Sequence, residues 1–260
     1  MARGQGVVHT PEEIEGIRIA ARTTATTLHK ICNSIRPGMT TLDINDLAGS
    51  LIAETGGISA FYGYPGAHGK FPSQVCISVN DEVVHGVGYA DRQIQFGDIV
   101  SIDCGIRLNG FIGDTARTVA VGPVSGDVAQ LLAVTEKSLH DGIAAARGGN
   151  IVRDIGVAVS KTVEAAGFAI VREYVGHGVG VELHEPPEIP NYPSNRAKQR
   201  LRPGMVIAIE PMVNIGTRGV KTDKDGWTVR TQDGKWSAHF EHMVLITEKE
   251  AEILTIPEGA

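Results

Sequence analysis

Asp103 and Asp114 stand on either side of Asn109-Gly110, a two-residue signal that is typical of a tight β-hairpin turn. If the two arms pair about this turn, Asp103 faces Ala116, and Asp114 points to the same face of the sheet. Diagonal neighbours on one face lie roughly 7–8 Å apart, so both carboxylates can reach one shared cluster. Like charges aimed at one place repel unless a proton or a cation lies between them. The pair alone leaves open a structural role, in which the carboxylates cap a turn or pair with arginines (Arg107, Arg117).

The second half of the chain repeats the order of motifs in the first half. Gly97-Asp-Ile-Val-Ser-Ile-Asp103 corresponds to Gly204-Met-Val-Ile-Ala-Ile-Glu210, and His85-Gly-Val-Gly88 corresponds to His177-Gly-Val-Gly180. Each half therefore predicts two helices, a histidine loop and an apolar strand that ends in a carboxylate. Two such halves packed face to face would bring the carboxylates and histidines to one centre. The repeat favours a chemical site over isolated ion pairs.

Glu241 and His177 add two further candidate ligands. Glu241 precedes an apolar strand, where an unpaired charge is costly to bury, although an edge-strand surface glutamate is the alternative. His177 lies between two glycines, where the backbone must pass close to another segment. Four carboxylates and one imidazole without a thiolate suit two divalent ions such as manganese, iron, cobalt or zinc, which can activate water for attack on a carbonyl compound. The predicted ligands are Asp103, Asp114, His177, Glu210 and Glu241.

Two histidines, His85 and His184, are not needed to complete this ligand set. His85 matches His177 in the repeat, and His184 begins His184-Glu-Pro-Pro. Both are candidates to hold substrate or to pass protons. The remaining histidines are interpreted as surface or structural residues: His9, His29, His68, His140, His239 and His242.

Capping signals and apolar periodicity predict two pairs of helices. Thr10-Pro11-Glu12-Glu13 is a capping box that starts a helix ending before Pro37-Gly38, and Thr40 starts a second that ends at Gly56-Gly57. The second half repeats the scheme from about Asp127 to Ala146 and from Ile151 to Ala166. The predicted strands are Val75–Val79, Ile99–Ile106, Phe111–Val121, Phe168–Tyr174 and Val206–Val213, with a last hairpin from Trp227–Thr231 through Asp233-Gly234 to Ser237–Thr247. We expect an α+β chain with one catalytic domain over 1–260, built from related halves at about 10–121 and 127–247.

The composition is ordinary for a globular protein. The 260 residues are 42% hydrophobic and 21% charged, and the net charge is −6. No cluster of Lys and Arg with interleaved aromatic residues occurs, so we expect no nucleic-acid partner. Three cysteines without paired spacing suit a reducing compartment, and no segment predicts a signal peptide or a membrane span. We expect a cytoplasmic monomer without a membrane partner.

Short motifs around these residues follow one another in the order typical of type I methionine aminopeptidases. The resemblance extends over nearly the whole chain. It is carried by Val75-Cys-Ile-Ser-Val-Asn80, Val84-His85-Gly86, Ser101-Ile-Asp103, Gly113-Asp114-Thr115, Gly176-His177-Gly178-Val-Gly180, Leu183-His184-Glu185-Pro186, Ile209-Glu210-Pro211-Met212, Trp227-Thr-Val229 and Phe240-Glu241-His242.

The resemblance implies the pita-bread fold, internally duplicated with pseudo-two-fold symmetry, in which a curved antiparallel sheet is backed by two pairs of helices. It also implies a metallo-exopeptidase that removes the initiator methionine from nascent polypeptides whose second residue is small. Ribosome contact is a further expectation from the family. Two divalent ions (Co, Mn, Fe or Zn) would be bound, with Asp114 and Glu241 bridging both, Asp103 serving one, and His177 with Glu210 serving the other.

The resemblance also implies roles at the substrate. Glu210 would handle the proton, His184 would contact the scissile carbonyl, and His85 would assist at the substrate amide. The predicted walls of the methionine pocket are Cys76, Trp227, Tyr62 and Phe71.

Two departures from the family pattern bear on the pocket. The segment from Tyr64 to Pro72 is longer than the usual loop, and Leu183 stands where many bacterial members carry an aromatic residue. One alternative function is a proline-specific peptidase of the same fold, whose members usually carry a separate amino-terminal domain. The other is an inactive relative that binds ribosomes or other proteins, which would require missing carboxylates, and none is missing.

Overall fold

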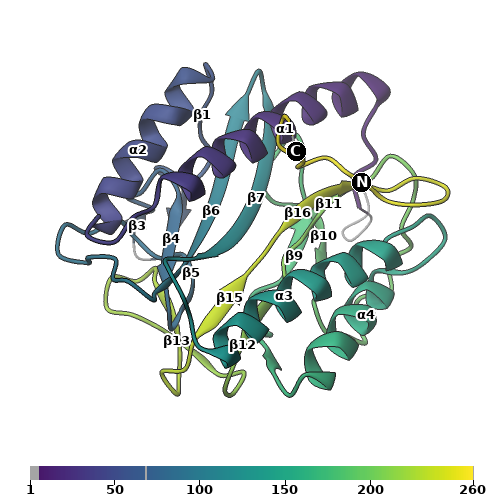
Figure 1. Cartoon of the computed structure of the whole chain (residues 1–260). Helices are drawn as coiled ribbons and strands as arrows, with labels where there is room; N and C mark the ends of the chain where they lie inside the picture. The colour runs from purple at the N-terminus through teal and green to yellow at the C-terminus, as the bar shows by residue number, and fades with distance from the viewer. Residues whose placement is uncertain (1–5, 68, 260) are drawn as a thin grey trace.

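Two pairs of helices cover one side of the molecule in the computed structural model, which describes residues 6–67 and 69–259 (Figure 1). The four helices of these ranges are α1 (Pro11–Ser34), α2 (Thr41–Glu54), α3 (Gly126–Ala145) and α4 (Val152–Ala165). Each half of the chain contributes one pair, as the periodicity predicts. Over the described ranges, we find no helix with the combination of length and apolar character that a bilayer crossing requires.

The first two helices begin with the side-chain caps that their sequences predict. The Thr10 hydroxyl accepts from the backbone N–H of Glu13 at 3.2 Å, and the Glu13 carboxylate accepts from the N–H of Thr10 at 2.8 Å. Thr40 and Asp43 make the same reciprocal pair at the start of α2. Each cap satisfies backbone donors that have no partner within the helix and contributes about 1 kcal/mol.

The long hairpin of β6 (Ile99–Leu108) and β7 (Phe111–Ala120) has the register predicted from its turn. Leu108 pairs with Phe111, and Asp103 pairs with Ala116. Asn109 and Gly110 both have positive φ angles, of 52° and 87°, which this tight turn requires. Asp103 and Asp114 therefore share one face of the hairpin.

The helix α1 lies across the other face of this hairpin and passes close to it at Gly113 (Figure 1). A Cβ atom at this position would overlap the Thr24 hydroxyl and the Ala20 carbonyl of α1. Glycine is required here because the helix backbone approaches the strand without room for a side chain.

The change Gly113→Ala is therefore expected to lower the free energy of unfolding by about 1–3 kcal/mol through overpacking. Urea unfolding of the metal-free protein measures this as a lower midpoint at an unchanged slope. Gly126→Ala is the matched control, because a Cβ at that helical position meets no atom within 4 Å. Equal midpoints for the two variants would contradict the tight approach of α1 to β7.

All strand pairs of the described residues are antiparallel. The first half builds a sheet in the order β1-β6-β4, with β7 paired to β6, and the second half builds the order β10-β9-β11-β16-β17. Smaller sheets have the orders β15-β12-β8, β13-β14-β5 and β2-β3. The bounds of the remaining strands are β1 (Ile58–Ser59), β2 (Pro65–Gly66), β3 (Gly69–Lys70), β4 (Cys76–Val79), β5 (Glu82–Val84), β8 (Ala169–Ile170), β9 (Gly176–Gly178), β10 (Glu185–Ile189), β11 (Val206–Ile209), β12 (Met212–Asn214), β13 (Val220–Thr222), β14 (Val229–Thr231), β15 (Ser237–His239), β16 (His242–Leu245) and β17 (Glu252–Ile253).

A buried apolar cluster joins the two halves. Ile17 of α1 and Ile112 of β7 come from the first half, whereas Val179 and Met243 come from the second, and all four lie in one cluster. Separate clusters fill the space under each helix pair. The halves therefore meet along a continuous core, and the strands that carry the candidate ligands are fixed relative to one another.

Two predicted strands and the last predicted hairpin differ from the structure. The expected strand Phe168–Tyr174 is reduced to β8, and the expected strand Val206–Val213 is divided into β11 and β12 at Glu210-Pro211. Proline lacks the N–H that a central strand must donate, which explains this interruption. The last predicted hairpin is wrong, because β14 pairs with β13 and β5, whereas β15 pairs with β12.

Candidate active site

Nearly every residue that the sequence predicts to bind metal or substrate lines a cavity of about 200 Å³. All five predicted metal ligands line it, and so do both histidines predicted to contact substrate. Three of the four predicted pocket walls line it as well, and Tyr62 is the exception. The predicted residues in the lining are Cys76, Phe71, His85, Asp103, Asp114, His177, His184, Glu210, Trp227 and Glu241.

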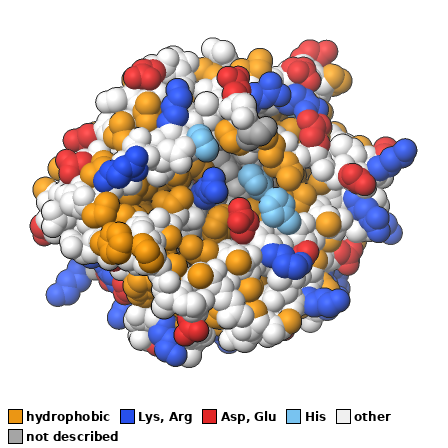
Figure 2. Space-filling view, in the orientation of Figure 1, with side chains coloured by type: hydrophobic (Ala, Val, Ile, Leu, Met, Phe, Trp, Pro, Cys, Tyr) orange, Lys and Arg blue, Asp and Glu red, His pale blue; other side chains and the backbone are white. Residues whose placement is uncertain are grey.

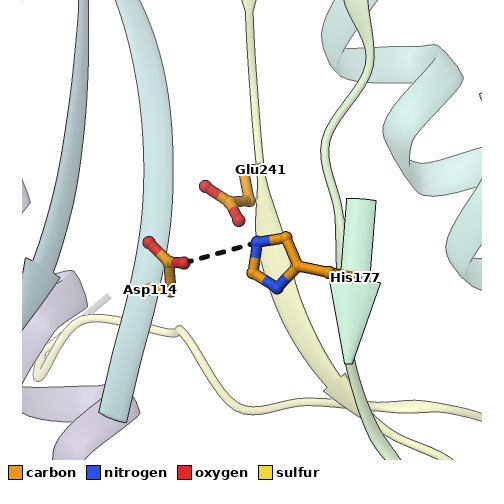
Figure 3. Close-up of side chains that lie close together, drawn as sticks. All are labelled: Asp114, His177 and Glu241. Atoms are coloured by element: carbon orange, nitrogen blue, oxygen red, sulfur yellow. Dashed lines mark ion pairs between the residues drawn. The ribbon is translucent and has the colours of Figure 1, made fainter. Parts of the chain in front are cut away.

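Three of the predicted ligands converge on one point (Figure 3). Asp114, His177 and Glu241 each offer a ligand atom, and these atoms all lie within 4.8 Å of one another. The Nε2 atom of His177 lies 3.8 Å from Oδ2 of Asp114 and 3.5 Å from Oε1 of Glu210. Asp114 on β7, His177 on β9, and the glutamates that follow β11 and β15 thus point to a common centre.

The strand interruptions place two of the carboxylates. Glu241 lies in the gap between β15 and β16, where its N–H donates to the carbonyl of Ala116 at 2.9 Å. The Thr115 hydroxyl donates to the Glu241 carbonyl at 2.7 Å, so this gap is tied to β7 next to Asp114. Glu210 directly follows β11, and its carbonyl accepts from the Asn191 amide at 3.0 Å. Asp103, which corresponds to Glu210 in the sequence repeat, lies instead within the uninterrupted strand β6.

The glycines on both sides of His177 let its strand pass close to the neighbouring strands. The strand β9 runs between β10 and β11, and a Cβ at Gly176 or Gly178 would overlap a carbonyl of a neighbouring strand. The Nδ1 atom of His177 lies 2.9 Å from the Gly178 carbonyl. Because only a protonated Nδ1 can donate to that oxygen, Nε2 is left with a free lone pair that faces Asp114 and Glu210.

Burial raises the pKa of every carboxyl group in this cluster, and neighbouring carboxylates raise it further in three of the four. Burial raises the pKa of Asp103 to about 7, against a lowering hydrogen bond from the Cys76 thiol. The pKa values of Asp114, Glu210 and Glu241 lie well above their ordinary range because of burial and then the neighbouring carboxylates. Four acids this close require protons or cations between them at neutral pH.

The carboxylate set fits metal ions better than a structural ion-pair network. Within residues 6–67 and 69–259, these four carboxyl groups form no ion pair with a lysine or an arginine, and Arg107 pairs instead with Glu182. The Oδ1 atoms of Asp103 and Asp114 are buried without a hydrogen-bond partner. Unpaired, inward-facing oxygens beside an imidazole lone pair are the donor set that divalent transition metals take.

The two predicted substrate histidines lie at the edge of this cluster. The ring of His184 lies 4.4 Å from that of His177, centroid to centroid, and the ring of His85 lies 5.2 Å from that of Tyr174. His85 has a positive φ of 59°, which is unusual for a residue other than glycine and is typical of functional sites. Burial lowers the pKa of His85 to about 4, so its ring is neutral at physiological pH.

Aromatic side chains form the apolar wall of the cavity. Phe71 and Trp227 pack edge to face with ring centroids 5.1 Å apart. Tyr62 is 61% exposed and lies outside the lining, so the structure does not place it in the predicted pocket. Phe61 and Tyr64 line the wall instead, because they are the two ends of a β-turn, closed by the Tyr64 N–H donating to the Phe61 carbonyl at 2.8 Å, whereas Tyr62 lies in its exposed middle. The turn signal is Gly63, whose φ of 80° suits the third position of such a turn and so places Tyr62 at its exposed second position.

Sequence reasoning also missed neighbours of the site in its second half. Tyr174 and Met212 line the cavity. His239, interpreted as surface or structural, is buried, and its Nε2 lies 3.7 Å from Oε2 of Glu210. Leu183, noted as a departure from the family pattern, is part of the wall. His68 lies outside the described residues.

The opposite, helix-covered side carries a separate shallow groove. Figure 2 shows histidine side chains around a hollow on that face. The residues that line the groove between α1 and α3 include His29, Arg117, Glu136 and His242. The groove lies behind the carboxylate cluster, since Glu241 contributes to its lining, but its other charged side chains, Arg117 and Glu136, are not part of the cavity described above.

Comparison with known proteins decides the family. The model of metallopeptidase family M24 matches residues 15–248. The chain belongs to metallopeptidase family M24. This membership, together with the Asp114–His177–Glu241 cluster, indicates an enzyme that depends on a divalent metal.

The M24 chain is similar over its full length to several methionine aminopeptidases. It is 47% identical over 249 residues to methionine aminopeptidase 1 of Bacillus subtilis, covering 96% of this chain and 98% of that protein. It is 44% identical over 252 residues to the methionine aminopeptidase of Clostridium acetobutylicum, covering 97% and 99%. The crystal structure of methionine aminopeptidase from Thermotoga maritima superposes with a TM-score of 0.92 at 41% identity, covering 96% and 99%. The fold of this M24 metallopeptidase is accordingly the pita-bread fold implied by the sequence motifs.

A solved structure of a proline-specific peptidase is a more distant match. The X-Pro aminopeptidase from Thermotoga maritima superposes with a TM-score of 0.75 at 22% identity, and the match covers 96% of this chain and 62% of that one. At this identity the likeness of the M24 chain to the X-Pro enzyme shows a shared fold and nothing further.

Proposed function

We propose that this M24 enzyme is a methionine aminopeptidase that hydrolyses the first peptide bond of nascent polypeptides with a small second residue. One observation carries the proposal. Four carboxyl groups and a neutral imidazole with a free lone pair meet without a lysine or arginine counter-ion in the described residues, beside an aromatic-walled cavity. The similarity to methionine aminopeptidases at 40–47% identity, against 22% to the X-Pro enzyme, supports methionine as the first residue.

The proposed metal site takes two divalent ions. Asp103 and Asp114 from the first half and His177, Glu210 and Glu241 from the second would hold these ions. Oxygen and imidazole donors without thiolate favour manganese, iron, cobalt or zinc. Ions bound there would supply Lewis acidity that activates water and polarises the scissile carbonyl.

The protein side chains hold the peptide and move its protons in this proposal. The apolar wall of Phe71, Trp227 and Cys76 would take the unbranched methionine side chain. His184 lies beside His177 and would donate to the carbonyl oxygen, while the neutral ring of His85 would contact the peptide amide. Glu210, whose pKa is raised by burial and then by Asp103, suits a group that accepts a proton from water and returns it to the leaving amine.

The test compares three peptides under anaerobic conditions with each candidate metal. We expect rapid release of methionine from Met-Ala-Ser, at least about 100-fold slower release from Met-Leu-Ser, and no cleavage of Ala-Pro-Ser. Released amino acids are measured by chromatography. Cleavage of Ala-Pro-Ser in preference to Met-Ala-Ser would favour the proline-specific function. Absence of any turnover with all four metals would contradict the enzymatic function.

A further inference from the structure

The hydroxyl of Tyr64 forms a hydrogen bond that joins the two halves of the chain at the cavity. Its oxygen lies 2.8 Å from Nδ1 of His184, 120 residues later in the sequence. The two rings meet edge to face, with centroids 5.4 Å apart and planes at 70°. Both residues line the cavity that contains the carboxylate cluster.

The backbone around Tyr64 holds this hydroxyl in place. The N–H of Tyr64 donates to the carbonyl of Phe61 at 2.8 Å, and the carbonyl of Tyr64 accepts from the N–H of Phe71 at 2.9 Å. Two residues after Tyr64, Gly66 packs against Trp227, where a Cβ would overlap the indole ring. The segment around Tyr64 is therefore held against the pocket wall, with the Tyr64 backbone fixed on both sides.

Contacts of the Glu185 carboxylate also hold the loop that carries His184 in place. One carboxylate oxygen of Glu185 accepts from the N–H groups of Val181 and Glu182, both at 2.9 Å. The other oxygen of Glu185 lies 3.2 Å from Nε2 of His9, which is buried. Among the described residues, Tyr64 is the one hydrogen-bond partner of the His184 ring, so Nε2 is left for the cavity.

A neutral imidazole carries one proton, and its hydrogen-bond partner decides which nitrogen holds it. If the phenol donates to Nδ1, the proton stays on Nε2. An Nε2–H can then donate to a carbonyl oxygen as negative charge develops on it, whereas an unprotonated Nε2 cannot.

We propose that Tyr64 is a positioning residue that donates its hydroxyl hydrogen to Nδ1 of His184 and so keeps the imidazole proton on Nε2, aimed at the scissile carbonyl. The inference rests on the proposed peptidase function. No covalent bond is made or broken by Tyr64, and the phenol hydrogen stays on its oxygen throughout.

The first test reads the tautomer directly, without turnover. Nitrogen-15 NMR of histidine-labelled, zinc-loaded protein, assigned with His184→Ala, is expected to show His184 protonated at Nε2 and hydrogen-bonded at Nδ1. In Tyr64→Phe both nitrogen signals should move toward the intermediate values of a tautomer mixture. A proton on Nδ1 in the unmodified protein overturns the proposal, and so does an unchanged tautomer in Tyr64→Phe.

The second test separates positioning from simple pocket contact. Tyr64→Phe keeps the ring and is expected to lower kcat for Met-Ala-Ser by about tenfold, with KM changed less than about twofold. Tyr89→Phe is the matched control, because its hydroxyl donates to Asp225 at 3.0 Å, it is 41% exposed against 37% for Tyr64, and it lies outside the cavity lining. This control should leave both constants unchanged.

A double variant completes the test. In the His184→Ala background, Tyr64→Phe should cause no further loss of kcat, because the partner through which it acts is gone. A loss that appears in KM and persists in that background overturns the inference and makes Tyr64 a wall residue. If the enzyme released no methionine at all, the proposed function would fail, while the tautomer measurement would still decide the role of Tyr64.

Discussion

The change Glu241→Gln is expected to lower kcat/KM for Met-Ala-Ser by about 10²–10³-fold or more. Glu241 is 2% exposed and lies between Asp114 and His177 at the point where ligand atoms converge. Glutamine keeps its shape and one oxygen acceptor but removes the charge that a divalent ion needs. Release of methionine, followed by chromatography at saturating metal, measures the loss.

The same variant is expected to make the metal-free protein more stable. In the native metal-free state burial raises the pKa of Glu241, and the charges of three neighbouring acids raise it further. Removing that group relieves a repulsion that metal would otherwise neutralise. A higher melting temperature in EDTA at pH 8, combined with lost activity, is the signature of a metal ligand.

The control for this pair of measurements is Glu164→Gln, an exposed glutamate on α4. It removes the same charge from the protein and should change neither activity nor melting temperature. If Glu241→Gln kept its turnover, the assignment of Glu241 as a ligand would be wrong. If it lost activity and stability together in EDTA, a packing role would explain the loss instead.

The parts of the site that depend on local signals could be predicted from the sequence. A two-residue turn fixes the register of every pair in a hairpin, so Asn109-Gly110 was enough to place Asp103 and Asp114 on one face. Capping residues predicted the starts of α1 and α2 for the same reason, since each cap contacts residues only three positions away.

The parts that depend on distant pairing could not be predicted in the same way. The strand β14 pairs with β5, which lies far earlier in the sequence. No residue near Asp233-Gly234 indicates that β14 pairs with β5 rather than with the segment after the turn. Tyr62 and Tyr64 are both aromatic and only two residues apart, so composition cannot distinguish them. Their difference arises from the turn over Phe61–Tyr64, which exposes Tyr62, and from the packing of Gly66 against Trp227, which is a tertiary contact.

The strands of the second half are interrupted where they carry the candidate metal ligands. Glu210 and Glu241 both leave the strand pattern, and both have their backbone groups bound by neighbours outside their own strands. An uninterrupted ladder would alternate these side chains strictly across the sheet. The interruptions let each glutamate turn toward β7, at the cost of ladder hydrogen bonds that Asn191, Thr115 and Ala116 replace.

The stabilisation that metal gives to this protein is expected to grow steeply between pH 5.5 and 7.5. The acids of the cluster have raised pKa values in the metal-free folded state, with that of Asp103 at about 7. The folded metal-free protein therefore keeps protons that the unfolded chain loses near pH 4, and these groups alone make it less stable as pH rises through that window. Metal binding requires the ionised forms and must displace those protons, so affinity rises over the same range.

Buried histidines act on the metal-free protein in the opposite direction. The pKa of His177 is lowered to about 4 by burial, then by His184, so the unfolded chain binds more protons than the folded protein between about pH 4 and 6.5. Stability from this group is therefore present above pH 6.5 and is lost as pH falls toward 4. The prediction therefore concerns the difference, or gap, between the melting temperatures of the metal-loaded and metal-free proteins. A histidine that is neutral in both folded forms contributes about equally to the two temperatures, so its contribution largely cancels in the difference.

At a manganese concentration about 1,000 times its dissociation constant, the gap at pH 7.5 should correspond to about 4 kcal/mol, or about 8–16 °C for a chain of this length. At pH 5.5 it should fall below about half of that value. Calorimetry in buffers of different ionisation enthalpy should also show protons released on binding at pH 5.5 and fewer at pH 7.5. Glu164→Gln should follow the unmodified protein, and Glu241→Gln should show a small gap at every pH. An equal gap at pH 5.5 and 7.5 would mean that the carboxylates are already ionised without metal, so that some other positive charge lies among them.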